Sequence, residues 1–209
     1  MINIGNWSNQ WLVKFSPTKT KSLIISNKQD SNLNPPVQLF GHNIEEVESH
    51  IYLGLRFSNN LRWKLHIEDI SHRARKKLNC MLPLKYKLDR KSLEIMYHSF
   101  VLPTMEYANV VWGGSFESDI SKLERVHVDA MRLVTGATAR SNINNLYKDC
   151  NWVTIKDQID GSSLKMMFKI VNGLAPEYLS NLVDKTDERP YNFRQTQSLK
   201  IPRCRLETF

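Results

Sequence analysis

The carboxylates are the first candidates for chemistry in this sequence, because metal-dependent phosphoryl transfer needs acidic side chains that converge on one or two metal ions. The main acidic groups lie at positions 45–48, 68–69 and 184–188. None of them follows the end of an apolar strand, where a pair of metal-binding aspartates would be held rigidly. We interpret them as solvated surface charge, and we expect neither catalytic residues nor metal ligands in this chain.

Nucleophilic and phosphate-cradling motifs are also missing from the sequence. The histidines have no glutamate at the spacing of a zinc-protease helix, and Cys80, Cys150 and Cys204 lie far apart without a C-x-x-C pair. The patterns G-x-x-x-x-G-K-[ST], G-x-G-x-x-G and G-x-S-x-G do not occur. We therefore expect no small-molecule cofactor.

Binding chemistry is indicated instead by a basic segment between residues 62 and 91. It holds ten basic and three acidic side chains, a net charge of +7, whereas the whole chain carries +8. The basic residues are Arg62, Lys64, Arg73, Arg75, Lys76, Lys77, Lys85, Lys87, Arg90 and Lys91. A cluster of this kind is often only a solvated helix face. Because nearly all of the net charge lies in one segment, we favour a nucleic acid as its partner.

Two elements would position this charge. Residues 50–57 predict one strand, whose period-2 alternation puts Ile51, Leu53, Leu55 and Phe57 on one face and His50, Tyr52, Gly54 and Arg56 on the other. A short turn leads from this strand into a helix. Its apolar stripe consists of Ile67, Ile70, Ala74, Leu78 and Met81. Arg73, Arg75 and Lys76 should then lie on the opposite, exposed face.

The rest of the chain predicts a mixed N-terminal region and a helical remainder. Before residue 58 we expect a helix over 4–14, a strand over 22–26, a loop over 27–36 and a hairpin around 41–43. After residue 60 the expected helices, besides the basic one, are 90–101, 118–135, 141–150, 154–171 and 176–182. The helix over 118–135 has its own apolar stripe, which consists of Ile120, Leu123, Val126, Ala130, Leu133 and Val134. The expected fold class is α+β, mostly α, with a small β-hairpin region followed by a helical bundle.

Several residues set the expected helix boundaries. The N-cap candidates are Asp89, Ser118, Ser141 and Thr154. Gly136 is expected just after a helix, where a left-handed residue is common, and Pro103 should kink or end the helix that begins at residue 90.

The bulk properties limit where the protein acts. A chain of 209 residues with 41% apolar and 24% charged residues suits a soluble protein of one or two domains. Its isoelectric point near 9.4 favours nucleic acid or another anionic surface. No apolar stretch approaches the roughly 20 residues of a membrane span, and no signal peptide is recognisable. We expect an intracellular protein without a membrane partner, and the nucleus is one compartment in which it could act.

Short motifs follow one another along nearly the whole chain. They are Phe15-Ser16-Pro17-Thr18-Lys19-Thr20-Lys21, Ile51-Tyr52-Leu53-Gly54-Leu55, Ala74-Arg75-Lys76-Lys77-Leu78, Ser99-Phe100-Val101-Leu102-Pro103, Leu123-Glu124-Arg125-Val126, Val171-Asn172-Gly173-Leu174-Ala175-Pro176 and Pro202-Arg203-Cys204-Arg205. In this order they resemble the C-terminal part of the reverse transcriptase of non-LTR retrotransposons, which are LINE-type and jockey-like elements.

The resemblance implies three parts. Residues 1–58 would be a palm remnant, residues 59–183 the helical thumb and residues 184–209 a basic tail. Lys19 would match a palm lysine that in the family has been proposed to assist the departure of pyrophosphate, although an exposed loop lysine is an equally good interpretation. Residues 52–54 would match the primer-grip hairpin, and the basic helix would lie along the template–primer duplex.

These arguments predict one set of nucleic-acid-binding residues. The set is Lys19, Lys21, Tyr52, Gly54, Arg56, Arg62, Lys64, Arg73, Arg75, Lys76 and Lys77. The expected partner is an RNA–DNA or DNA duplex.

The resemblance also implies what the chain lacks. The family's metal-binding aspartates, including the Tyr-x-Asp-Asp turn, lie upstream of the lysine motif, and this chain begins after them. We expect a fragment of an RNA-directed DNA polymerase that is inactive alone, lacks its palm and fingers partners, and would meet Mg²⁺ only in a complete polymerase. Two alternatives stay open. One is a non-catalytic basic helical module that binds nucleic acid or an acidic protein. The other is a decayed element copy without function, whose apolar strand face would be exposed.

Overall fold

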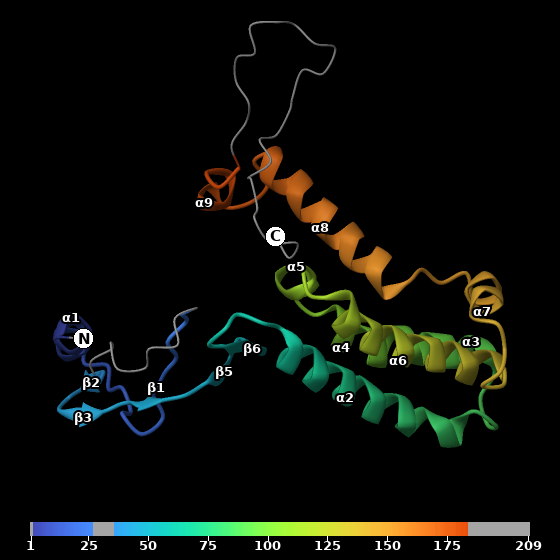
Figure 1. The fold of residues 1–209 in the computed structure, drawn as a ribbon, viewed down its shortest axis with the longest axis horizontal. Coiled ribbons are helices and arrows are strands. Elements are labelled where there is room, and N and C mark those ends of the chain that lie inside the picture. Colours follow the sequence, from blue (N-terminus) through green and yellow to red (C-terminus); the bar gives the residue numbers. More distant parts are fainter. Residues whose placement is uncertain (1, 27–35, 184–209) are drawn as a thin grey trace, which may run out of the picture. The chain divides into compact units, whose positions relative to one another are not determined.

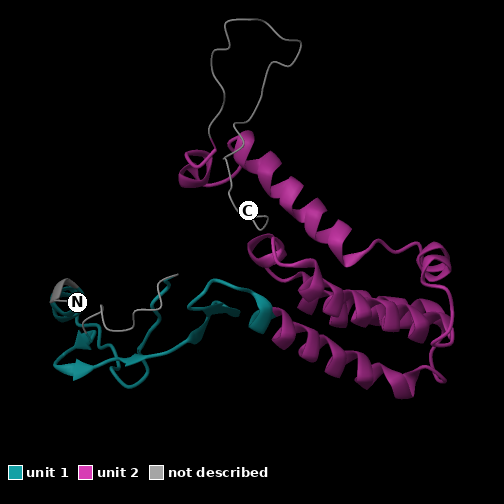
Figure 2. Ribbon diagram, viewed as in Figure 1, with its two compact units in different colours: residues 1–66 teal, residues 67–209 magenta. Residues whose placement is uncertain are grey.

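The computed structural model describes residues 2–26 and 36–183 (Figure 1). The predicted basic tail and most of the loop predicted over 27–36 therefore lie outside the described residues. The chain divides into two compact units, Met1–His66 and Ile67–Phe209 (Figure 2). This division falls within the basic helix, and the boundary predicted after residue 58 stays a prediction.

The described part of the first unit is built from one helix and six short strands. They are α1 (Ile2–Gln10), β1 (Lys21–Ser22), β2 (Gln38–Leu39), β3 (His42–Asn43), β4 (Glu45–Glu46), β5 (Ser49–Tyr52) and β6 (Leu55–Ser58). β1 pairs with β4 in parallel, while β2 with β3 and β5 with β6 form antiparallel pairs. Leu39, Ile44 and Leu55 are the buried apolar side chains among its described residues, so its core is small.

The single strand predicted over residues 50–57 is wrong, because β5 and β6 form a hairpin. Leu53 and Gly54 link them with φ angles of 48° and 80°. A two-residue turn with positive φ at both positions matches the twist of antiparallel strands, and glycine adopts such angles without the steric cost of a side chain. The apolar alternation continues through the turn, so periodicity could not reveal it.

The hairpin changes which side chains share a face. Tyr52 lies opposite Leu55, and Ile51 lies opposite Arg56. Residues opposite each other in an antiparallel pair project to the same side of the sheet. Leu53 is 71% exposed in the turn, whereas Leu55 is 8% exposed. The continuous apolar face predicted for this segment therefore does not exist.

The second unit is helical in its described residues, apart from its connections. The helices are α2 (Lys64–Met81), α3 (Arg90–Met96), α4 (Leu102–Glu106), α5 (Asn109–Trp112), α6 (Glu117–Thr135), α7 (Ile143–Cys150), α8 (Ile155–Val171) and α9 (Glu177–Ser180). A 3₁₀ turn (Leu82–Leu84) follows α2, whose first turn belongs to the first unit, and a π-helical turn (Tyr97–Val101) joins α3 to α4. The predicted class, α+β and mostly α, is confirmed.

The apolar stripes predicted for α2 and α6 form the core of this unit. All five stripe residues of α2 are buried, and Ile67, Ala74 and Met81 are 0% exposed. α6 runs through the centre of the helical layer, with Leu123 and Val126 fully buried (Figure 1). Helical spacing of apolar residues was therefore enough to identify these two buried faces.

Polar contacts fasten α6 to the helices that follow it. The Glu124 carboxylate accepts hydrogen bonds from the Tyr147 hydroxyl of α7 and from the Ile155 N–H, at 2.9 Å, at the start of α8. Burial raises the pKa of Glu124. The carboxylate thus satisfies an N–H group at the N-terminus of α8 that has no partner within the helix.

Two of the predicted N-caps are confirmed and two are wrong. The Asp89 carboxylate accepts the Ser92 N–H, and the Thr154 hydroxyl accepts the Asp157 N–H. α6 follows Phe116 without a side-chain cap in place of Ser118, and Asn142 rather than Ser141 caps α7. Asparagine and serine are almost equally good caps, so adjacent candidates cannot be ranked from sequence.

Gly136 follows α6 as expected, whereas the helical backbone that begins at Arg90 does not end before Pro103 but continues to Glu106. Gly136 has φ of 75° directly after α6. Pro103 lies at the start of α4, just after the π-helical turn. A proline ring clashes with the carbonyl four residues earlier in a regular α-helix, and the wider turn before Pro103 gives that ring room.

Candidate nucleic-acid interface

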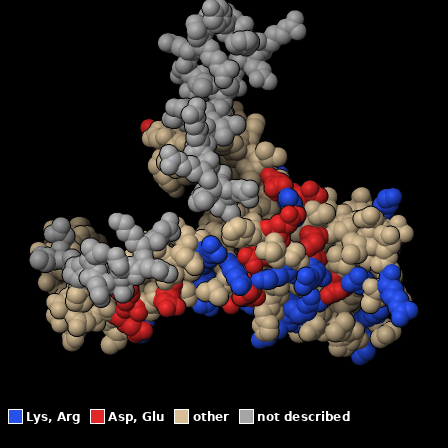
Figure 3. Space-filling model, in the orientation of Figure 1, with Lys and Arg blue, Asp and Glu red and all other residues tan. Residues whose placement is uncertain are grey.

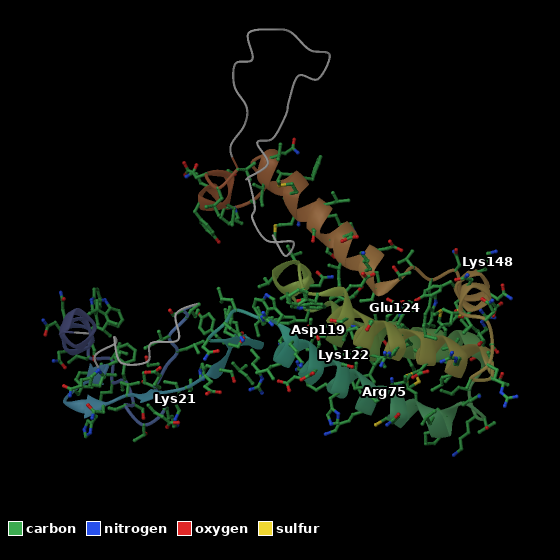
Figure 4. The ribbon with its side chains drawn as sticks, in the orientation of Figure 1. Lys21, Arg75, Asp119, Lys122, Glu124 and Lys148 are labelled. Atoms are coloured by element: carbon green, nitrogen blue, oxygen red, sulfur yellow. The ribbon has the colours of Figure 1, made fainter. Side chains whose placement is uncertain are left out.

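The predicted lysines of the first unit differ in their surroundings. Lys19 lies in a turn in which its N–H and that of Thr20 donate to the Ser16 carbonyl, at 3.2 and 3.1 Å. Its side chain is exposed and has no carboxylate partner among the residues that the structure describes. Lys21, on β1, forms an ion pair with Glu45 of β4 (Figure 4). Lys19 is therefore the better placed of the two to meet an anion.

The β5–β6 hairpin presents an apolar tip. Ile51, Tyr52 and Leu53 are 52%, 64% and 71% exposed, and Gly54 completes the turn. Tyrosine and leucine side chains are usually more buried than this, so the tip has the character of a contact surface.

Arg56 forms hydrogen bonds with Ser49 of the hairpin and with His66 at the start of α2. Its guanidinium lies 3.5 Å from the Ser49 hydroxyl, and its backbone N–H donates to Nδ1 of the buried His66 at 3.3 Å. His66 is in the first turn of α2. The hairpin is therefore hydrogen-bonded to the start of the basic helix.

Arg62 and Lys64 lie where the chain enters α2, and both are exposed. The Asn60 side chain accepts the Arg62 N–H at 3.0 Å, and the Ser58 hydroxyl donates to the Arg62 carbonyl at 2.8 Å. These bonds fix the turn before the helix.

Arg73 and Lys76 are the exposed cations of α2 within the second unit. They are three residues apart, so they lie on the same side of the helix, away from the buried stripe. Neither has a carboxylate partner in the described ranges 2–26 and 36–183. Arg73 and Lys76 therefore fit the prediction of a solvent-exposed, positively charged helix face.

Arg75 and Lys77 do not belong to that face, which corrects the prediction for Arg75. Arg75 forms an ion pair with Asp129 of α6. The Lys77 ammonium donates to the Phe100 carbonyl at 3.0 Å and to the Thr104 hydroxyl at 2.8 Å, and it lies 4.6 Å from the centroid of the Phe100 ring. Long basic side chains extend along a helix toward polar groups at its edges, so these two reach opposite neighbours.

A second row of cations was missed by the sequence analysis. Lys122, Arg125 and Arg132 lie along α6, and Lys and Arg side chains gather over α2 and α6 in Figure 3. Their spacings of three and seven residues put them on one edge of the helix, and that spacing was the available signal. Aspartates at 119 and 129 nearly balance their charge, so the net charge of the segment did not reveal them.

Among the described residues, two of the three α6 cations form ion pairs, and only that of Lys122 crosses to a carboxylate of α2. Lys122 donates to Glu68 of α2 at 2.8 Å and to Asp119 at 2.9 Å (Figure 4). These hydrogen bonds raise the pKa of Lys122, which is therefore charged at neutral pH. Asp129 accepts both Arg75 and, at 2.9 Å, Arg132.

The described ranges contain neither a candidate metal-binding group nor a candidate membrane-spanning helix. No group of three or more His, Cys, Asp or Glu side chains there is arranged to hold a metal ion. No helix in the same ranges combines the length and the apolar character that a membrane crossing requires.

Comparisons with known proteins point to mobile elements. No protein-family model and no solved structure matches the chain. The RNA-directed DNA polymerase from mobile element jockey of Drosophila melanogaster is 23% identical over 189 residues, which cover 88% of this chain and 20% of that protein. The probable RNA-directed DNA polymerase from transposon BS of the same fly is 24% identical over 165 residues, covering 76% of this chain and 18% of the relative.

A third relative is the probable RNA-directed DNA polymerase from transposon X-element of Drosophila melanogaster, which is 23% identical over 162 residues, 76% of this chain and 18% of the relative. The chain thus spans about a fifth of the length of the curated relatives that it matches. These similarities confirm the predicted resemblance, and the chain is related to the reverse transcriptases of non-LTR transposable elements.

Proposed function

We propose that this chain is the part of an RNA-directed DNA polymerase that holds the template–primer duplex, with Arg73 and Lys76 of α2 as its phosphate contacts. The similarity to polymerases of mobile elements supports the class of ligand. The proposal assigns nucleotide addition, with its metal ions, to carboxylates of a longer polymerase and not to this chain.

The observation that carries the proposal is the exposure of two cations without carboxylate partners among the described residues. An exposed arginine or lysine gains little from a surface ion pair, but at a nucleic-acid phosphate it releases a condensed counterion. Arg73 and Lys76 lie one helical turn apart, so both can face the same strand. Phosphate contacts of this kind carry no sequence information, so binding should be independent of sequence.

Lys19 and the tip of the β5–β6 hairpin extend the proposal to the first unit. The Lys19 ammonium would meet phosphate, and Tyr52 would pack against the sugar or base of a terminal nucleotide. Stacking on an aromatic ring tolerates any base, as a polymerase that copies every sequence requires.

The test is duplex binding by a variant that carries Arg73→Gln and Lys76→Gln. Fluorescence anisotropy with an RNA–DNA duplex, over a series of salt concentrations, gives the affinity and its salt dependence. We expect weaker binding to all duplex sequences, and a log–log salt slope that is smaller by roughly 2, because each phosphate contact contributes about 0.9.

A matched control is Lys148→Gln with Lys169→Gln, which removes the same charge from exposed positions on α7 and α8. If the test and control variants lose the same affinity, the loss follows from net charge alone and contradicts the proposal. Unchanged binding in the test variant would do the same. Competition by poly-glutamate as strong as that by duplex would favour the alternative of a module that binds an acidic protein.

A further inference from the structure

A groove of about 330 Å³ runs between α2 and α6 in the second unit. Its walls are Glu68, Ser71, His72, Arg75, Lys122 and Arg125. The α2 residues recur at intervals of three and four, so they form one row beside the buried stripe. The α6 residues lie three apart and face that row across the groove, as the Lys122–Glu68 and Arg75–Asp129 ion pairs require (Figure 4).

The cations of this groove are not equivalent. Lys122 is shared by Glu68 and Asp119, and Arg75 shares Asp129 with Arg132. Arg125 is exposed and has no carboxylate partner in the part of the chain that the structure describes. It therefore offers a complete set of guanidinium donors to a ligand.

The lining selects an anion as the ligand. Three cations, a hydroxyl and an imidazole face one carboxylate, and the lining residues include no aliphatic side chain and no Phe, Tyr or Trp ring for an apolar ligand to pack against. A guanidinium binds a phosphate through two parallel N–H···O bonds, and a neighbouring ammonium and hydroxyl can take the remaining oxygens. The volume suits one phosphodiester group with part of its sugar.

We infer that the α2–α6 groove binds a backbone phosphate of a nucleic-acid strand, with Arg125 as its direct contact and Glu68 as a carboxylate that screens Lys122. This inference rests on the proposed function, and it extends the duplex footprint from the outer side of α2 to a second helix. Glu68 weakens the site, because it occupies the ammonium that the phosphate would otherwise meet.

The first test is Arg125→Gln in the full chain, measured by anisotropy with the same RNA–DNA duplex. We expect weaker binding and a salt slope smaller by about 0.9, the contribution of one phosphate. Lys148→Gln is the control for loss of one exposed charge. If Arg125→Gln behaves like this control while the Arg73/Lys76 variant still weakens binding, the groove is not a site and the proposed function stands. If the Arg73/Lys76 variant and Arg125→Gln both match their charge controls, both ideas fail.

The second test predicts an effect of opposite sign. Glu68→Gln frees Lys122 from one of its two carboxylates, and an exposed ion pair of this kind corresponds to a roughly 1.5- to 5-fold change in affinity. Duplex binding should tighten by that factor. Glu177→Gln, which removes an exposed carboxylate from α9, controls for net charge. Weaker binding, or the same tightening in the control, would overturn the inference, and thermal unfolding of each variant checks that the fold is intact.

Discussion

At the scale of single residues, His127 of α6 is a buried titratable group with a hydrogen-bond partner for each ring nitrogen. It is 0% exposed, and its Nε2 lies 3.1 Å from the Val153 carbonyl. A carbonyl only accepts hydrogen bonds, so Nε2 carries the proton and Nδ1 accepts from the Tyr97 hydroxyl. The Trp152 ring stacks on the Tyr97 ring with centroids 4.5 Å apart. The neutral imidazole makes both of these hydrogen bonds, and its burial disfavours the charged form.

This arrangement makes the free energy of unfolding depend on pH. Burial lowers the pKa of His127 from 6.5 to about 4. Between these values the unfolded chain binds the proton and the folded chain does not, so stability is complete above pH 6.5 and falls as the pH drops toward 4. We expect this residue to account for a loss of about 3 kcal/mol over that range.

Urea unfolding at a series of pH values, for the parent chain and for His127→Gln, measures the effect. The glutamine amide can still donate to the Val153 carbonyl but does not titrate. Burial raises the pKa of Glu106 and Glu124, which acts in the opposite direction, and these groups are common to both chains. Parallel stability curves for the two chains would refute the role of His127.

At the scale of elements, the β5–β6 turn depends on Gly54. Its φ of 80° is unfavourable for any residue with a Cβ. Gly54→Ala should destabilise the hairpin by about 1 kcal/mol. Hydrogen exchange of the amides of β6 measures this directly, with faster exchange expected.

Gly114→Ala is the matched control for that substitution. A Cβ at Gly114 would meet nothing within 4 Å, and Gly114 is not among the residues with positive φ. Exchange in β6 should be unchanged in this variant. If Gly54→Ala also left exchange unchanged, the turn would not require a glycine.

Sequence patterns predicted helices better than strands in this chain. A helical stripe samples five or six positions, so the buried faces of α2 and α6 emerged despite local exceptions. The hairpin did not, because its turn has Leu53 where a strand pattern expects an apolar residue and lacks the usual Asn-Gly signal. Strands of two residues, such as β1 and β4, are set by long-range pairing that no local pattern reports.

At the scale of the whole molecule, an exposed apolar face on α8 is expected to govern association. Leu164 and Phe168 are four residues apart and are 71% and 63% exposed. Adjacent apolar side chains of this size drive self-association in water. The double variant Leu164→Ser and Phe168→Ser should shift the chain toward monomer in sedimentation velocity at equal concentration.

A control for this experiment is Ile143→Ser, because Ile143 is 46% exposed but lies on α7. It should leave association as it is. If the parent, the double variant and the control associate to the same degree, the exposed face of α8 does not drive self-association.

The candidate site was predicted only in part, because the partners of its cations come from helices that are distant in the sequence. Net charge identified α2, because its cations outnumber its carboxylates. The same count could not separate the exposed Arg73 from the paired Arg75, since their partners come from other helices. The count of net charge did not identify Arg125 either, because the acidic and basic residues of its segment nearly balance. Only in the folded structure does Arg125 lie beside the cations of α2.

The opposite attachments of Arg75 and Lys77 have a mechanical consequence. One side chain ties α2 to α6 and the other ties it to the π-helical turn and α4, so the helix cannot roll about its own axis without breaking one of them. In the proposed complex, a duplex that advanced past α2 by one nucleotide would pull sideways on Arg73 and Lys76 and exert a torque on the helix. The contacts of Arg75 and Lys77 resist that torque in both directions, so α2 would keep its orientation while the strand moves along it.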